Sequence, residues 1–92
     1  MKVVYRLEAL QDLDRHCAYV LERNPDAARS IADILHHSIS RLERFPYSGR
    51  QGIVPGTYEL VVPKLPYIVV YRVTEHVEIV SMFHTSTDEP RS

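Results

Sequence analysis

Four side chains of this 92-residue sequence could take part in acid–base or anion-binding chemistry: His84, Glu59, Arg72 and Arg50. Imidazole side chains are common general acids and bases, so His84 could have such a role, although a histidine at the end of a strand is more often structural or solvated. Glu59 and Arg72 could serve as a base and an oxyanion-stabilising cation if their strands brought them together. A cross-strand ion pair would explain these two residues equally well.

Arg50 directly follows Gly49 in a segment rich in glycine and proline, so we expect its guanidinium to be exposed in a loop. There it could bind a phosphate or a carboxylate of a partner protein. It could also cap the end of the preceding helix. Both interpretations stay open at the level of the sequence.

The histidines and the cysteine lack the spacing of a metal site. His36 and His37 are adjacent in a predicted helix and point about 100° apart, so they cannot bind one ion as an i, i+4 pair can. His16 and Cys17 have the same geometry, and no second cysteine completes a zinc site or a disulfide. We predict no metal and no cofactor, and we interpret Cys17 as a small buried side chain.

Two amphipathic helices are predicted for the first half of the chain, after a short strand. Residues 2–6 contain three strand-favouring side chains in a row. Apolar side chains then recur every three or four residues over 8–23 and over 27–45, which indicates helices with one buried face. Asn24 can cap the second helix and Pro25 suits its first turn, so the helices should form a hairpin. The predicted core-facing residues include Leu10, Leu13, Leu42 and Phe45.

Three strands are predicted for the second half. Residues 46–56 hold all three glycines and two of the six prolines, so they should form a loop. Strand-favouring runs follow at 58–62, 67–73 and 77–84, and the short connection between the last two suits a hairpin, so we expect an antiparallel meander. Both faces of these last two strands carry apolar side chains. We expect something beyond the helical hairpin to cover them.

The predicted fold class is therefore α+β: an N-terminal strand, a helical hairpin and a three-stranded antiparallel meander, forming one antiparallel sheet packed by two helices. A chain of 92 residues fits a single domain, which we assign to residues 1–92. Residues 85–92 are polar and contain Pro90 near the end, so we predict a flexible tail there.

Charge and hydropathy exclude several classes of protein. Lys and Arg number 11 against 12 Asp and Glu, a net charge of −1, which argues against a chain that coats nucleic acid by itself. No window approaches the roughly 18 apolar residues of a membrane span, and the first residues lack the apolar core of a secretory signal. We expect no membrane association and a cytoplasmic location.

Six short segments along the chain carry a family resemblance. They are Ala9-Leu10-x-Asp12-Leu13, Asn24-Pro25-x-Ala27-Ala28, Leu42-x-x-x-Pro46-x-x-Gly49-Arg50, Tyr58-Glu59-Leu60, Pro66-Tyr67-Ile68-x-x-Tyr71-x-Val73 and Val77-x-Ile79-x-x-x-x-His84. In this order and spacing, over nearly the whole chain, they resemble the RelE/ParE superfamily of toxins from bacterial type II toxin–antitoxin systems. The resemblance implies the same α+β fold.

RelE-type members of that superfamily cut mRNA on the ribosome by attack of a ribose 2′-hydroxyl on the adjacent phosphate, which requires a base, an acid and cationic stabilisation. They place an arginine directly after the aromatic residue that opens the third strand, where this chain has Ile68 after Tyr67. They usually carry another arginine a few residues beyond the position of His84, where this chain reads Thr85-Ser86-Thr87-Asp88-Glu89. The resemblance is therefore closer to ParE-like members, of the plasmid stabilisation family, and favours a protein that is not an enzyme.

Three functions stay open. A ParE-like toxin would inhibit DNA gyrase by binding it, without catalytic residues of its own. A RelE-type, ribosome-dependent mRNA interferase, which is an endoribonuclease, would have to use His84, Glu59, Arg72 and Arg50. A degenerate member of the superfamily would be a non-toxic binding module. We place the ParE-like toxin first because the arginines of the RelE type are missing.

All three functions imply a protein partner. The resemblance predicts a cognate antitoxin of the ParD or RelB kind, whose disordered segment would fold over the apolar sheet face or the helical hairpin in a hetero-oligomer. Such antitoxins typically carry the DNA-binding part. This chain, which is nearly neutral, should therefore reach DNA only through the antitoxin complex.

Overall fold

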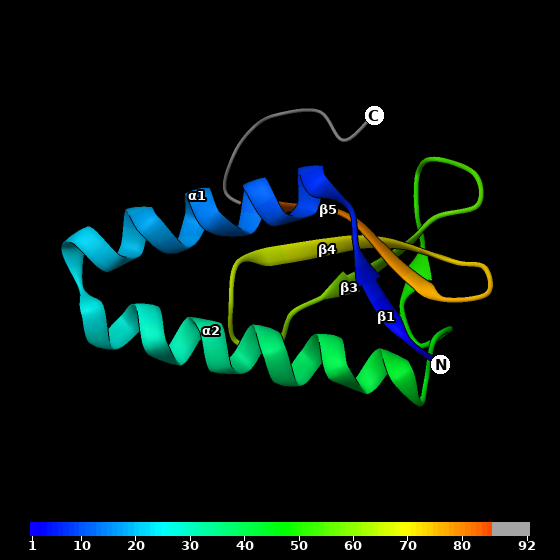
Figure 1. Cartoon of the computed structure of the whole chain (residues 1–92), viewed down its shortest axis with the longest axis horizontal. Helices are drawn as coiled ribbons and strands as arrows, with labels where there is room; N and C mark the ends of the chain where they lie inside the picture. The colour runs from blue at the N-terminus through cyan, green and yellow to red at the C-terminus, as the bar shows by residue number, and fades with distance from the viewer. Residues whose placement is uncertain (86–92) are drawn as a thin grey trace.

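Asn24 separates the two helices of the computed structural model, which describes residues 1–85 (Figure 1). Helix α1 spans Leu7–Arg23 and α2 spans Pro25–Ser40. Asn24 is extended, and its side-chain oxygen accepts a hydrogen bond of 3.1 Å from the amide of Ala27, which caps α2. The predicted hairpin and its cap are therefore confirmed. The predicted flexible tail lies, after its first residue, outside the described residues.

Helix α2 ends earlier than its apolar pattern predicts. After Ser40 the chain tightens into a 3-10 helix, η1, at Arg41–Glu43. Leu42 stays in the core at 0% exposure, but Phe45 is 55% exposed, so its predicted place in the core is wrong. The cause is a change of helical twist: about three residues per turn in η1, in place of about 3.6, carry the following side chains away from the apolar stripe of α2.

Helix α1 buries a different row of residues from the one predicted at its start. Leu10 is 44% exposed, whereas the neighbouring Ala9 is 2% exposed and lies in the core. Leu13 packs against the core as predicted. Neighbouring helical residues point about 100° apart, so the packing that buries Ala9 leaves Leu10 in solvent. The prediction for Leu10 is therefore wrong.

Five strands form one sheet in the order β1-β5-β4-β3-β2. Their bounds are Val3–Tyr5 for β1, Arg50–Gln51 for β2, Tyr58–Val61 for β3, Tyr67–Val73 for β4 and Val77–His84 for β5. The meander β3–β4–β5 is antiparallel, as predicted. The predicted sheet needs two corrections: β1 runs parallel to β5, and a fifth strand, β2, lies inside the predicted loop and pairs antiparallel with β3. Side-chain alternation is the same for a strand in either direction, so it could not reveal that β1 is parallel.

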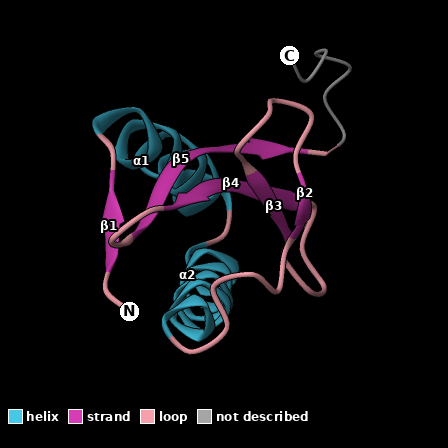
Figure 2. Ribbon diagram, turned by 90° about the vertical axis from the view of Figure 1, so that its right-hand side faces the viewer, coloured by secondary structure: helices cyan, strands magenta, loops and turns pink. Residues whose placement is uncertain are grey.

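The alternation of side chains along β4 gives the sheet two faces (Figure 2). Tyr67, Val69 and Tyr71 point toward the helices and are at most 3% exposed. Figure 2 shows the sheet arching over α2, and α1 packs beside β5. The buried members of the core that results are Ala9, Leu35, Ile39, Leu42, Val62, Tyr67, Val69, Tyr71, Val77, Ile79 and Met82.

The opposite side of the sheet, which we call the outer face, mixes apolar and charged side chains. Its β4 residues are Ile68, Val70 and Arg72. Ile68 is 5% exposed, and its register partner on β3, Val61, is 50% exposed. The helices pack on the other side of the sheet. The expectation that something else covers this apolar surface stays a prediction.

A side chain of α1 continues the hydrogen bonding of β5 where β1 ends. Strand β1 pairs with β5 only at residues 77–79, and the amide of Arg6 donates to the carbonyl of Ile79. Farther along β5, the amide of Met82 donates a hydrogen bond of 3.1 Å to the carboxylate of Asp12. Asp12 thus supplies the acceptor that a longer neighbouring strand would supply, and it ties α1 to the sheet.

Tyr71 holds the loop that precedes β2. Its ring is fully buried and stacks on Tyr58 with centroids 5.6 Å apart. Its hydroxyl accepts a hydrogen bond of 2.9 Å from the amide of Gly49. A Cβ at Gly49 would lie 2.6 Å from that hydroxyl, so a residue with a side chain would have to push the tyrosine away. The loop and the sheet therefore meet through a close contact that glycine permits.

Replacing Tyr71 with Phe should lower the free energy of unfolding by about 1–3 kcal/mol, because the amide of Gly49 would lose its partner in a partly buried place. Urea unfolding followed by circular dichroism measures this change. The matched control is Tyr47→Phe, which should change the midpoint little because Tyr47 is 63% exposed. Equal losses in the two variants would contradict the role given to the Tyr71 hydroxyl.

Candidate functional site

Arg50 and Glu59 form an ion pair on the outer face, across β2 and β3, where they are register partners. The Nε and Nη2 atoms of Arg50 each lie 2.9 Å from Oε1 of Glu59. Glu59 is 5% exposed, and a carboxylate this buried needs a cation beside it. Arg50 therefore lies in a strand, not in an open loop, and its guanidinium is bound to a carboxylate of its own chain.

Arg72 forms a second ion pair, with Glu78 in place of Glu59. The two residues are register partners across β4 and β5 on the outer face. Nε of Arg72 lies 3.0 Å from Oε1 of Glu78, and Nη2 contacts the same oxygen. The hydrogen bond from Arg72 lowers the pKa of Glu78 below its usual value. Glu59 and Arg72 thus lie on the same face of neighbouring strands, two register positions apart, but each forms its ion pair with a different residue.

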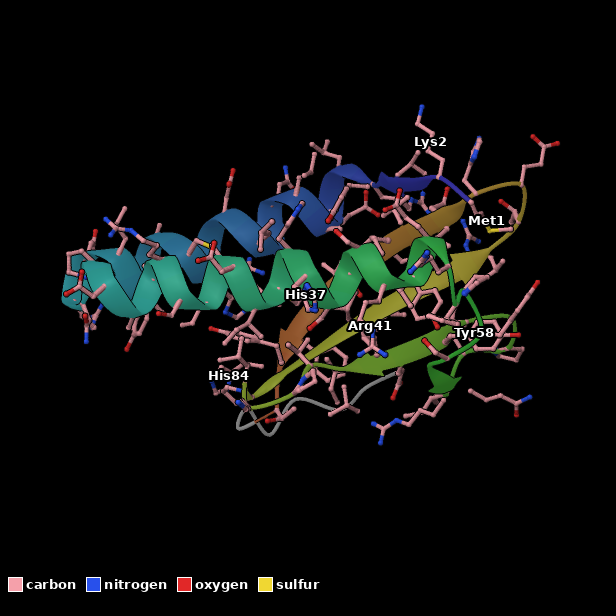
Figure 3. The ribbon with its side chains drawn as sticks, turned by 90° about the horizontal axis from the view of Figure 1, so that it is seen from below. Met1, Lys2, His37, Arg41, Tyr58 and His84 are labelled. Carbon is pink, nitrogen blue, oxygen red and sulfur yellow. The ribbon has the colours of Figure 1, made fainter. Side chains whose placement is uncertain are left out.

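His84 lies on the helix-facing side of the sheet, far from Arg72. It is the register partner of Tyr67, which points toward the helices, whereas Arg72 points to the outer face. Along extended β4, Tyr67 and Arg72 are about 17 Å apart at roughly 3.3 Å per residue. Figure 3 shows His84 at one end of the sheet and Tyr58, the neighbour of Glu59, toward the other. The four candidate residues therefore do not form one site.

His84 belongs to a cluster of three rings that joins α1 to the sheet. The ring centroid of Tyr67 lies 5.2 Å from that of His16 and 5.3 Å from that of His84, edge to face in both cases. The two imidazoles are 6.3 Å apart and inclined by 22°. Sequence reasoning missed His16 as a partner of His84. The signal was its helical spacing from Ala9 and Leu13, which puts it on the buried face of α1.

The surroundings of this ring cluster shift the pKa values of His16 and Tyr67. Burial lowers the pKa of His16, and the charges of Arg15 and His84 lower it further, against the opposing effect of Asp12. Burial raises the pKa of the Tyr67 phenol. At neutral pH the His16 imidazole is therefore uncharged and the phenol keeps its proton. The cluster combines a proton acceptor with a weak proton donor.

The possible metal ligands and the single cysteine were examined for their surroundings in residues 1–85. Within residues 1–85, no group of three or more His, Cys, Asp or Glu side chains could hold a metal ion. Cys17 is partly buried, and burial together with the charge of Asp14 raises the pKa of its thiol, which disfavours the reactive thiolate. No helix in residues 1–85 is both long enough and apolar enough to cross a membrane.

Residues 3–89 match the model of the family described as "ParE toxin of type II toxin-antitoxin system, parDE". The chain belongs to this family of ParE toxins. It is 34% identical over 90 residues to "Putative toxin Y4kP" of Sinorhizobium fredii (strain NBRC 101917 / NGR234), which covers 98% of this chain and 94% of that protein. A solved structure, "Chromosomal ParDE TA system from P. aeruginosa", matches with a TM-score of 0.83 over 94% of this chain and 97% of that one. At 20% identity, this second likeness shows the shared fold.

This ParE-family toxin differs from RelE-type ribonucleases at a position that the structure describes. Ile68, directly after Tyr67, is 5% exposed and points to the outer face. An aliphatic side chain at that position cannot stabilise the charge of a phosphate. The segment after Thr85, where RelE-type members carry another arginine, lies outside the described residues.

Acidification should destabilise the toxin through His16. The folded state holds the pKa of His16 below its usual value of 6.5, so the unfolded chain binds more protons between the two values. The free energy of unfolding should therefore be fully retained above about pH 6.5 and should fall as the pH drops below it. Urea midpoints measured from pH 8 to pH 5 test this dependence.

Two variants identify the group that is responsible. His16→Gln should flatten the pH dependence, because an amide does not titrate in this range. His36→Gln removes an exposed histidine of α2 and should leave the dependence as it is. If the midpoint falls as steeply in His16→Gln as in the wild type, another group causes the effect.

Proposed function

We propose that this ParE-family toxin inhibits DNA gyrase by binding to it, and that a cognate antitoxin neutralises the toxin by binding in turn. The observation that supports binding over catalysis is the separation of the candidate catalytic groups. Arg50 and Arg72 are paired with carboxylates on the outer face, and His84 lies on the helix-facing side. No substrate atom could contact all of them at once.

Cleavage of a phosphodiester would require these groups to come together. A base, an acid and a cation must lie within hydrogen-bonding distance of the same phosphate and its neighbouring hydroxyl. Releasing Arg50 for this purpose would take the cation away from the buried carboxylate of Glu59, which is unfavourable. Inhibition by binding requires no such rearrangement.

One observation favours a second candidate function, the RelE-type mRNA interferase. The rings of His16, Tyr67 and His84 place two imidazoles and a phenol side by side, and such groups can move protons during RNA cleavage. The guanidinium of Arg15, next to His16, forms an ion pair with Asp12 and is more than half exposed, so an interferase would also have to release this arginine. An interferase would then depend on His16 and His84, and the ion pairs of the outer face would have no catalytic role.

The partners follow from the same proposal. The net charge of −1 gives the toxin little attraction for DNA, so binding to an operator would belong to the complex with the antitoxin. Toxin and antitoxin would form a hetero-oligomer. A toxin that inhibits gyrase would act in the cytoplasm, where bacterial DNA is supercoiled.

The test compares gyrase and mRNA as targets of one protein preparation. Toxin freed from its antitoxin should inhibit the supercoiling of plasmid DNA by gyrase, and adding the antitoxin back should restore supercoiling. The same toxin should leave mRNA on programmed ribosomes uncut. Circular dichroism of each sample confirms that the toxin is folded.

His84→Ala and His16→Ala separate the candidate functions. If the toxin acts on gyrase by binding elsewhere, both variants should still inhibit supercoiling. mRNA cleavage by the wild type that disappears in either variant would replace the gyrase proposal with the interferase. A folded toxin that binds its antitoxin but is inactive in both assays would be a non-toxic binding member of the family.

A further inference from the structure

Lys64 has a backbone conformation that a lysine rarely adopts. It lies in the turn between β3 and β4, and its φ of 67° is positive. Within residues 1–85, every other residue with a positive φ is a glycine. The side chain of an L-residue crowds its own backbone in this conformation, whereas glycine adopts it without strain. Lys64 therefore occupies a position that glycine would suit better.

The neighbours of Lys64 impose this conformation. Pro63 precedes it, and the amide of Leu65 donates a long hydrogen bond of 3.4 Å to the carbonyl of Val62. Proline at the second position and a positive φ at the third characterise a type II turn, whose third residue is normally glycine. Val62 is buried and Leu65 packs against the core. A relaxation of Lys64 to a negative φ would disturb these two core contacts.

Further hydrogen bonds hold the turn in place. The amide of Val62 donates to the carbonyl of Tyr67 at 3.1 Å, and the amide of Thr85 donates to the carbonyl of Pro66 at 2.8 Å. The prolines at positions 63 and 66 each have a fixed φ. A turn that is anchored in this way presents its exposed side chain from a fixed backbone. Less conformational entropy is then lost when the side chain binds a partner.

The side chain of Lys64 forms no polar contact that would explain the strain. It is exposed, and it makes no ion pair or hydrogen bond with another residue of the described part of the chain. No Asp or Glu occurs in the sequence between Glu59 and Glu75, so the turn carries a single positive charge. Strained residues that the rest of the fold holds in place are concentrated at functional sites.

We infer that Lys64 binds a carboxylate on the surface of gyrase, and that the turn keeps a lysine at a strained position for this contact. The inference rests on the proposed function, because it takes gyrase as the target. An ammonium group pairs with a carboxylate or a phosphate. A chain with a net charge of −1 has little attraction for DNA, which favours the carboxylate. A rigid contact suits a folded partner, whereas a disordered antitoxin segment adapts its own shape on binding.

Three variants of Lys64 test the inference through the inhibition of DNA supercoiling by gyrase. Lys64→Gly removes the strain and the charge, Lys64→Gln removes the charge alone, and Lys64→Arg keeps both. The toxin concentration that halves supercoiling should rise about fivefold for the Gly and Gln variants, as expected for the loss of one exposed ion pair. Lys64→Arg should inhibit like the wild type.

Urea unfolding separates a functional lysine from a structural one. Lys64→Gly should raise the urea midpoint by about 0.5 M, because the strain disappears. A lysine that only stabilises the turn would lose stability and inhibition together. The inferred lysine loses inhibition in the same Gly variant that gains stability. A lower midpoint for Lys64→Gly would therefore overturn the inference.

Lys2→Gln is the matched control for the loss of charge. Lys2 is also exposed, and it forms no ion pair within residues 1–85. This variant should inhibit gyrase like the wild type. All three Lys64 variants should bind the antitoxin with wild-type affinity in isothermal titration calorimetry. If they bind the antitoxin weakly and still inhibit gyrase fully, the turn contacts the antitoxin and the inference is wrong.

Binding of the toxin to gyrase without DNA distinguishes a carboxylate from a phosphate. In surface plasmon resonance, Lys64→Gln should bind gyrase more weakly than the wild type when DNA is absent. If the two differ only when plasmid DNA is present, Lys64 contacts a phosphate and the inference fails.

Two further outcomes separate this inference from the proposed function. If the wild-type toxin inhibits gyrase and every Lys64 variant inhibits it equally well, the inference fails while the proposed function stands. If the wild-type toxin neither binds nor inhibits gyrase, both fail.

Discussion

The alternation of side chains along β4 is the constraint on which the geometry of the candidate site depends. Tyr67, Val69 and Tyr71 fill the core beneath the helices, so the residues between them must point to the outer face. A slip of one residue would exchange the two faces and bury the guanidinium of Arg72. The hydrogen bond from Gly49 to the Tyr71 hydroxyl helps to hold the register in place. Because of this alternation, Arg72 lies on the outer face and His84 lies on the helix-facing side of the sheet.

The ion pairs of the outer face serve strand pairing. Arg50 links β2 to β3 through Glu59, and Arg72 links β4 to β5 through Glu78. Exposed pairs of this kind contribute little energy individually, but the burial of Glu59 makes its partner difficult to remove. An arginine that must stay with its carboxylate is not free to stabilise a transition state. A toxin that works by binding is compatible with both pairs remaining intact.

Helix α1 packs in the core with one face and leaves Leu7, Leu10 and Leu21 exposed on another. On the core side, Asp12 accepts a hydrogen bond from the backbone of β5, and His16 packs against Tyr67 and His84. A domain of 92 residues has a small interior, so apolar side chains left in solvent weigh heavily in its stability. The core contacts of α1 thus leave part of the helix surface in contact with solvent.

The local elements could be predicted from the sequence alone, because helix caps, apolar periodicity and strand propensity are properties of neighbouring residues. The family resemblance came from the order and spacing of the short motifs along the chain. Asn24 predicted where one helix ends and the next begins, and the three strands of the meander were placed within a residue of their observed bounds. Periodicity predicted an apolar stripe but not its limit, which is why Phe45 was misplaced. Three features could not be predicted from local sequence: β1 is parallel to β5, Arg72 pairs with Glu78, and His16 lies beside His84. Each of these depends on contacts between elements, and the strand register that sets them is a property of the whole sheet.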